Sequence, residues 1–253
     1  MIPINEFGEK ARINKVPITT IVRDYAQDWL LVFLPKMAFK GGTCLRKIYI
    51  KNYRFSDDLD FTLLDDISFI DLKKKIRNSM ETARNESGIN FLDDIKSEEI
   101  ENGFVFLIYF RLLRTTGDPL KIKIDVTKND KENIVNDILN KTIIHDYSDK
   151  FDKKTLVYSL EEIFAEKTRS LFERVRPRDL YDVWYLIDYS KFDKSLFEKK
   201  CEFKNFTPSI DELQLRKSDF INSWENSLKH QLKNLPSADE VFNSVIKFLE
   251  NKI

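Results

Sequence analysis

The sequence contains few glycines and few cysteines, and each shortage limits the kinds of site and cross-link that the chain can form. Only 6 of the 253 residues are glycine, so the adjacent pair Gly41-Gly42 stands out from a background that is otherwise poor in glycine. The two cysteines, Cys44 and Cys201, lie far apart along the chain. A disulfide framework is therefore excluded, and two free thiols in a reducing compartment are expected.

Long apolar runs and a surplus of one charge are also missing. No uncharged run reaches the ~18 residues of a membrane-spanning helix. Nothing resembles a secretion signal, since the N-terminus carries acidic as well as basic residues, Glu6, Glu9, Lys10 and Arg12, before any apolar run. We therefore expect a cytoplasmic protein with no membrane partner. Basic and acidic residues number 42 each, so any surface for nucleic acid has to be local. The two histidines, His145 and His230, lack partners at zinc-ligand spacing, which favours surface or structural roles.

Hydrophobic periodicity predicts an α+β unit followed by a helical half. Period-two alternation and turn residues predict strands at 37–40, 58–64, 91–98, 103–113 and 119–127. Helical spacing predicts helices at 18–35, 43–50, 66–87, 131–140, 159–174, 177–189, 208–232 and 237–251. The polar segment 141–156 is the expected boundary, so we predict an α+β domain over 1–145 and a helical domain over 146–253.

The double glycine and its hydroxyl neighbour, Gly41-Gly42-Thr43, lie between a predicted strand and a predicted helix. Glycine lets the backbone approach a phosphate closely, and a helix N-terminus offers free N–H groups and the positive end of the dipole. The motif therefore predicts a phosphate-binding turn, with an ordinary tight turn as the alternative. It is not a P-loop, because the terminal Gly-Lys-Ser/Thr is absent.

Two aspartates, Asp58 and Asp60, alternate with Leu59 and Phe61, which places both carboxylates on one face of a strand. Aspartate is disfavoured in strands, and neighbouring carboxylates repel each other unless a cation lies between them. Such oxygen ligands suit Mg²⁺, which completes its shell with water and nucleotide phosphates. The sequence therefore predicts a metal site, with a solvated strand face as the alternative.

Three further residues extend this pattern. Arg54 and Ser56, just before the aspartates, are candidates to contact a triphosphate, or else pair with a carboxylate and cap the turn. Asp125 lies on the polar face of strand 119–127. If that strand neighbours the aspartate strand, three carboxylates converge as two-metal phosphoryl transfer requires, and Lys123 neutralises phosphate charge. The alternative is an exposed face that carries lysines.

The helical half contributes one lysine and two aspartates. Lys167 falls on the apolar stripe of helix 159–174, so its ammonium must either reach out to solvent or meet an anion such as a triphosphate. Asp179 and Asp182 share a face of helix 177–189. Asp179 suits the positive end of the helix dipole, and an orienting or catalytic role for either aspartate is the alternative.

Together these blocks resemble the AbiEii/AbiGii-type nucleotidyltransferase toxins, the toxin component of abortive-infection toxin–antitoxin systems. The matching segments are 39–45, 54–61, 122–125, 161–167 and 176–182. The resemblance implies a DNA-polymerase-β-like nucleotidyltransferase fold with a helical C-terminal half. It also implies Mg²⁺-dependent transfer of a nucleotide from an NTP, the 3′ end of tRNA as the acceptor, a block of translation, and a cognate antitoxin as partner. By matching position, Asp58 and Asp60 become metal ligands, Asp125 the third carboxylate and Thr43 a phosphate contact.

The resulting hypothesis assigns a role to each candidate residue. The catalytic set is Asp58, Asp60, Asp125, Lys167, Asp179 and Asp182, of which the first three hold Mg²⁺, with two ions expected when NTP is bound. The nucleotide-binding set is Gly41, Gly42, Thr43, Arg54, Ser56, Lys123 and Lys167. Lysine clusters at 73–75 and 199–200 either contact RNA or line solvated helix faces. The alternatives are a protein or small-molecule hydroxyl as the acceptor, nucleotide binding without turnover, or a structural role in a complex.

Overall fold

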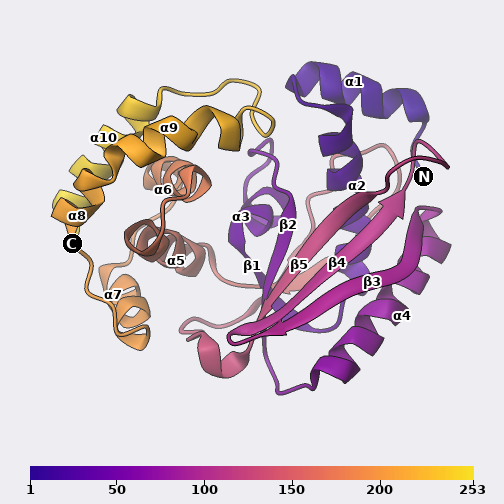
Figure 1. The fold of residues 1–253 in the computed structure, drawn as a ribbon, viewed down its shortest axis with the longest axis horizontal. Coiled ribbons are helices and arrows are strands. Elements are labelled where there is room, and N and C mark those ends of the chain that lie inside the picture. The colour runs from indigo at the N-terminus through magenta and orange to yellow at the C-terminus, as the bar shows by residue number, and fades with distance from the viewer. The chain divides into compact units, whose positions relative to one another are not determined.

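A computed structural model describes residues 1–253 and contains one mixed sheet of seven strands in the order β3-β4-β5-β2-β1-β7-β6. Figure 1 labels β1 to β5 of this sheet. The strands are β1 Met37–Lys40, β2 Asp58–Leu63, β3 Asn90–Ile100, β4 Gly103–Arg111, β5 Leu120–Thr127, β6 Leu139–Thr142 and β7 Lys154–Val157. β2 runs antiparallel to β1 and parallel to β5, whereas β4 is antiparallel to both β5 and β3. The predicted α+β class is confirmed.

The helices comprise ten α-helices and two short segments of other helical type. They are α1 Ile4–Asn14, α2 Ile18–Phe33, α3 Gly41–Cys44, the π-helix η1 Leu45–Tyr49, α4 Phe69–Ser87, the 3₁₀ segment η2 Asn129–Lys131, α5 Leu160–Glu173, α6 Pro177–Tyr189, α7 Lys194–Phe203, α8 Ile210–Leu215, α9 Lys217–Leu228 and α10 Ala238–Glu250. None of these helices combines the length and the apolar character that a membrane-spanning helix requires.

Contacts divide the chain into two compact units. Unit 1 comprises residues 1–132 and 138–157, and unit 2 comprises 133–137 and 158–253. By contacts unit 1 extends to Val157, whereas the sequence predicted a boundary after residue 145, because β7 joins the sheet of unit 1 beside β1 and β6. Each strand has only four residues, too few for a clear alternation in the sequence.

The core of unit 1 lies on one face of the sheet, beneath α2 and α4. Alternate residues of β4 and β5 are fully or almost fully buried, and Phe69 of α4 stacks on Phe104 at 5.6 Å and on Phe106 at 5.9 Å between ring centroids. Local signals fix the ends of α4. The Ser68 side chain accepts a hydrogen bond from the Asp71 N–H at its start, and Gly88 closes it with φ of 74°.

Two helix predictions in the sequence are wrong. Residues 131–140 form the end of η2, a loop and the start of β6 instead of a helix. The Val135 and Asn136 N–H groups donate to the Glu162 carboxylate at 2.8 and 3.1 Å, so a tertiary contact takes the donors that a helix would have used. Residues 208–232 contain two helices, α8 and α9, which meet at Arg216.

Candidate active site

The glycine turn opens directly onto the predicted catalytic strand. Gly41 has φ of +77°, a conformation that glycine adopts without strain, and a Cβ added there would collide with the Asp60 carboxylate. A Cβ on Gly42 would lie 2.5 Å from Nη2 of Arg54 and 3.4 Å from Oγ of Ser56. The absence of both side chains therefore leaves room beside the turn for the side chains of Asp60, Arg54 and Ser56.

Thr43 fastens this turn to β2. Its hydroxyl donates a hydrogen bond to the backbone carbonyl of Asp58, and the side chain is buried. The structure thus gives the Thr43 hydroxyl a positioning contact. Lys40, the last residue of β1, pairs in register with Asp60 of β2, so the turn begins opposite the second aspartate.

The parallel pairing of β2 with β5 places Asp125 beside Asp60. In register, Asp60 lies opposite Asp125 and Asp58 lies opposite Lys123. Lys123 Nζ is 2.6 Å from Oδ2 of Asp125. β2 and β5 are neighbouring strands, so the condition for the carboxylates to converge is met. Burial raises the pKa of the adjacent Cys44 thiol, and the negative charge of Asp60 raises it further.

The donors on this face fit a divalent cation that a nucleotide also ligates. Asp58 and Asp60 present oxygen donors only, and Asp125 follows on the next strand. Mg²⁺ in proteins is typically held by one or two carboxylates together with substrate phosphates. The structure contains no group of three or more His, Cys, Asp or Glu side chains placed to hold a metal by themselves. The carboxylates therefore suit an ion that arrives with its nucleotide better than an ion held in a closed protein cage.

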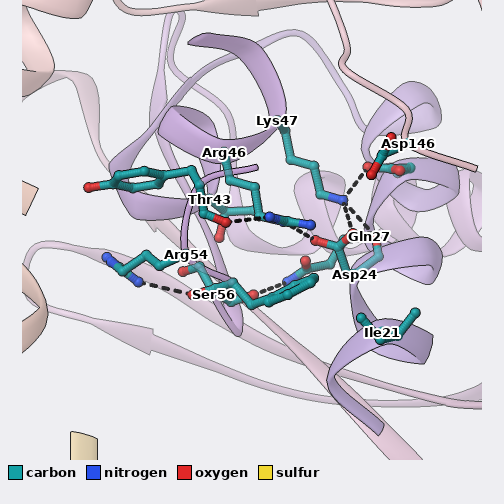
Figure 2. A network of polar contacts seen from close by, with 12 residues as sticks. Ile21, Asp24, Gln27, Thr43, Arg46, Lys47, Arg54, Ser56 and Asp146 are labelled. Carbon is teal, nitrogen blue, oxygen red and sulfur yellow. Dashed lines mark hydrogen bonds and ion pairs between the residues drawn. The ribbon is translucent and has the colours of Figure 1, made fainter. Parts of the chain in front are cut away.

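A buried polar network joins α2 to the segment that follows the glycine turn (Figure 2). Arg46 and Lys47, in η1 immediately after the glycine turn, point toward Asp24 of α2, at 2.7 Å from Oδ1 and 2.8 Å from Oδ2. Lys47 also lies 2.7 Å from Asp28. Burial raises the pKa of Asp24, but the charges of Arg46 and Lys47 outweigh it, so the pKa lies well below its usual range.

The same helix positions the segment that carries Arg54 and Ser56. Gln27 donates to the backbone carbonyls of Ser56 and Asp57 at 3.1 and 3.0 Å. The Arg46 guanidinium lies 3.7 Å from the centroid of the Phe55 ring and donates to the Tyr53 carbonyl. Arg54 itself is buried and donates to the Phe55 carbonyl at 3.1 Å.

Sequence reasoning missed the α2 network, although a signal was present. Gln27 and Asp28 lie three and four residues after Asp24, on a helix whose other buried residues are apolar or aromatic apart from Thr20. Such a polar stripe on a buried face requires partners, because an unpaired buried charge is costly. The identity of those partners depends on residues far along the chain, and the sequence does not supply it.

Lys167, Asp179 and Asp182 form a second cluster, within unit 2. Lys167 Nζ lies 2.6 Å from Oδ1 of Asp179 and 2.9 Å from Oδ2 of Asp182, and Arg174 lies 3.0 Å from the other oxygen of Asp179. Burial raises the pKa of Asp179, but the charges of Lys167 and Arg174 outweigh it and the pKa is lowered. Of the two alternatives, solvent or an anion, the Lys167 ammonium meets an anion. Its anionic partners are the carboxylates of Asp179 and Asp182.

One predicted basic cluster is reassigned by the structure. Lys200 is fully buried, 2.7 Å from Glu162 and 3.1 Å from Glu166, so it is neither a solvated lysine nor one available to RNA. Its neighbour Lys199 is exposed.

The His145 side chain is buried between Asp28 and Asp149, with ring nitrogens 2.9 and 2.7 Å from their carboxylate oxygens, which confirms a structural role for it. Cys44 and Cys201 are free, as expected.

A cavity elsewhere in unit 1 does not coincide with this site. It has a volume of about 500 Å³ and lies at the opposite ends of β1 and β2, lined by Phe33, Met37, Leu63 and Leu72 among others. None of the predicted site residues borders it. The candidate site in unit 1 is therefore the carboxylate-bearing sheet face together with the glycine turn.

Comparisons with known proteins agree with the resemblance read from the motifs. The family described as nucleotidyl transferase AbiEii toxin, type IV TA system, matches residues 26–247. Curated proteins give no significant match. The nucleotidyltransferase toxin MenT4 from Mycobacterium tuberculosis is similar in structure, with a TM-score of 0.70 and 19% identity over 98% of this chain and 88% of that one. A protein from H. pylori described as a nucleotidyltransferase has a TM-score of 0.61 and 18% identity, over 92% and 95% of the two chains. These likenesses confirm the nucleotidyltransferase fold.

Proposed function

The chain belongs to the AbiEii nucleotidyltransferase toxin family, and from that premise we propose that it transfers a nucleotide from an NTP to the 3′ end of tRNA. The modified tRNA would no longer be aminoacylated, and translation would stop. The observation that carries the proposal is the convergence of the Gly41-Gly42 turn, Asp60 and Asp125 at adjoining positions of β1, β2 and β5. A cognate antitoxin is the expected partner of such a toxin.

The residues of unit 1 divide the work of nucleotide binding. Backbone N–H groups of the glycine turn bind phosphate oxygens, because no side chain shields them. Arg54 and Ser56, which border Gly42, contact the triphosphate from the side. Lys123 balances phosphate charge while its Nζ contacts Asp125. Asp58 and Asp60 would hold Mg²⁺, which when bound neutralises the triphosphate and lowers the pKa of the acceptor hydroxyl.

The transfer step is an in-line displacement at the α-phosphorus. The acceptor oxygen forms a bond to phosphorus, the bond to the bridging oxygen of the β-phosphate breaks, and pyrophosphate leaves. Asp125 helps to activate the acceptor hydroxyl, either by accepting its proton or by holding a second ion beside it. In unit 2, the cluster of Lys167, Asp179 and Asp182 keeps its predicted role in charge balance and orientation as a proposal.

The decisive experiment incubates the protein with Mg²⁺, each labelled NTP in turn and total tRNA. We expect label in tRNA with at least one NTP, and expect it to fall to background with Asp60→Ala or when EDTA removes the metal. Asp152→Ala removes an exposed carboxylate of the same type and should leave transfer unchanged. Full residual activity in Asp60→Ala would contradict the proposed site.

The remaining alternatives produce different results in the same assay. Label that survives RNase and migrates with protein or with a small molecule indicates another acceptor hydroxyl. NTP binding without any transferred label indicates a nucleotide-binding module without turnover.

A further inference from the structure

The sheet face that carries the carboxylates continues well beyond Asp125. Because side chains alternate along each strand, register partners on neighbouring strands share a face. One row across the sheet runs Asp60, Asp125, Val105, Glu98, the next runs Asp58, Lys123, Leu107, Lys96, and Tyr109 stands opposite Lys121 in a third. We name the part formed by Lys96, Val105, Leu107, Tyr109 and Lys121 the β4 platform.

The β4 platform faces away from the core of unit 1. The intervening residues of β4 and β5 are buried beneath α2 and α4, whereas Val105, Leu107 and Tyr109 are half-buried and Lys96 and Lys121 are exposed. Lys96 Nζ lies 5.6 Å from the centroid of the Tyr109 ring, which places the two side chains together on this face. A row of apolar and aromatic groups is thus flanked by lysines.

The order of the strands indicates which side of the carboxylates the acceptor approaches. The glycine turn follows β1, on one side of Asp60, and Asp125 of β5 lies on the other side. In an in-line displacement the attacking oxygen and the leaving pyrophosphate stand on opposite sides of the phosphorus. With the triphosphate on the glycine turn, the acceptor reaches the phosphorus over β5 and β4.

The chemistry of the β4 platform fits a nucleic acid that presents unstacked bases. Single-stranded nucleic acids bind by stacking bases on aromatic side chains while lysines and arginines contact the phosphates. Tyr109 provides such a ring, Leu107 and Val105 provide adjoining apolar surface, and Lys96, Lys121 and Lys123 are cations on the same face. Glu98 lies opposite Val105 at the outer edge of this face.

We propose that the β4 platform binds the single-stranded 3′ end of the RNA acceptor, an inference that rests on the proposed nucleotide transfer. Tyr109 stacks on a base, Lys121 contacts a phosphate, and the terminal hydroxyl lies toward Asp125. The local surface explains how a chain with no net charge binds RNA, because the cations need only gather on one sheet face.

Binding of a labelled single-stranded RNA and of total tRNA tests the inference without requiring turnover. Tyr109→Thr removes the ring and keeps a residue that favours strands, and we expect a loss of affinity of about 10-fold. Tyr109→Phe should retain wild-type affinity. Lys121→Ala should reduce the slope of log affinity against log salt by about one phosphate contact. The KM for NTP should not change in any of these variants.

The matched control lies on α4, which covers the opposite face of the sheet. Lys74 is exposed there, and Lys74→Ala should bind RNA as the wild type does. RNA affinity that is unchanged in Tyr109→Thr and Lys121→Ala, or a wild-type protein that binds no RNA, overturns the β4 platform. Loss of affinity in Lys74→Ala alone would place the RNA on α4 and overturn it equally.

Failure of the platform and failure of the proposed function give different results. If the wild type transfers label while both platform variants bind RNA normally, nucleotide transfer is supported and the β4 platform is contradicted. If the platform variants lose RNA affinity but the wild type transfers no label to RNA, the β4 platform is supported and nucleotide transfer is contradicted. Asp60→Ala should lose transfer and keep RNA affinity.

Discussion

Single residues of the site could be predicted where their chemistry depends on near neighbours in the sequence. Asp58 and Asp60 could be identified because two carboxylates on one face of a strand require a stabilising partner. Gly41-Gly42 could be identified because glycine is otherwise sparse. The structure adds how they fit together. The space that a side chain at Gly41 would fill is occupied by the carboxylate of Asp60. Any other residue at position 41 would therefore displace the aspartate.

Substitution of Gly41 tests this dependence. Gly41→Ala should abolish or strongly reduce nucleotide transfer, because the new Cβ displaces the Asp60 carboxylate. Its backbone strain should also lower the free energy of unfolding by ~1–2 kcal/mol, since φ is +77°. Transfer assays and urea denaturation measure the two effects separately.

Gly117 offers a control with the same backbone strain and no neighbour. Its φ is +85°, and nothing lies within 4 Å of the position of an added Cβ. Gly117→Ala should therefore lose a similar free energy of unfolding and keep wild-type transfer. Wild-type transfer in Gly41→Ala as well would show that the turn does not position Asp60.

Lys200 shows where the character of a single residue is not enough. Lys199 and Lys200 are adjacent and identical in sequence, yet one is exposed and the other is fully buried against Glu162. Lys200 is buried because it pairs with the carboxylate of Glu162, which also accepts hydrogen bonds from the backbone N–H groups of Val135 and Asn136. No local pattern in the sequence specifies that contact.

Removing the Lys200 cation should destabilise unit 2. Lys200→Met leaves the Glu162 carboxylate buried without its ion-pair partner, and we expect a loss of ~3–5 kcal/mol in the free energy of unfolding. Lys199→Met makes the same chemical change at an exposed position and should remain close to wild type. Urea denaturation followed by far-UV circular dichroism measures both variants, and equal stability of the two would contradict the buried ion pair.

At the scale of elements, the sequence predicted those whose periodicity is long and regular. The alternation in β4 and β5 and the helical spacing of α6 are each recovered within two residues. One prediction failed where tertiary contacts decide the structure, at 131–140. The short strands β6 and β7 and the helices α1 and α7 were not predicted. The loop between β6 and β7 carries His145, whose partners Asp28 and Asp149 come from α2 and from the loop itself.

The buried imidazole of His145 should make the stability of unit 1 depend on pH. Burial lowers its pKa, but hydrogen bonds and charges from Asp28 and Asp149 outweigh burial, so the pKa is raised above 6.5. Its surroundings comprise these two carboxylates, Lys47 on the other oxygen of Asp28, and the rings of Tyr25, Tyr147 and Phe151.

The sign of the effect follows from the raised pKa. The protonated imidazole stabilises the folded state fully below pH 6.5, and this contribution is lost as the pH rises through the folded-state pKa. The pKa of Asp149 is lowered, so its contribution stays constant in this window. We expect the difference in unfolding free energy between wild type and His145→Gln to shrink from pH 6 to pH 8. A difference that is constant or grows would contradict a charged His145.

At the scale of the whole molecule, the division into units is less simple than a single boundary. The chain leaves unit 1 after Glu132, contributes 133–137 to unit 2, returns for 138–157 and then continues into unit 2. The sequence predicted a boundary within the polar segment 141–156 because polarity marks surface-exposed chain. Polarity does not reveal that β7 runs beside β1, with Val157 opposite Phe39.

Two fragments distinguish the predicted boundary from the division by contacts. A fragment of residues 1–157 retains the whole sheet, whereas 1–145 ends between β6 and β7 and loses both β7 and Asp149. Without β7, the backbone groups of β1 on that side lose their partner, and such an open edge favours aggregation. His145 also keeps only one of its two carboxylates in the shorter fragment.

We therefore expect 1–157 to unfold cooperatively in urea and to remain monomeric, and 1–145 to unfold at a lower urea concentration or to aggregate. Far-UV circular dichroism and size-exclusion chromatography measure these properties on both fragments side by side. Equal stability of the two fragments would favour the predicted boundary at residue 145 and would mean that β7 contributes little to unit 1. Because β1 leads directly into the Gly41-Gly42 turn, greater stability of 1–157 should also be accompanied by tighter binding of NTP with Mg²⁺.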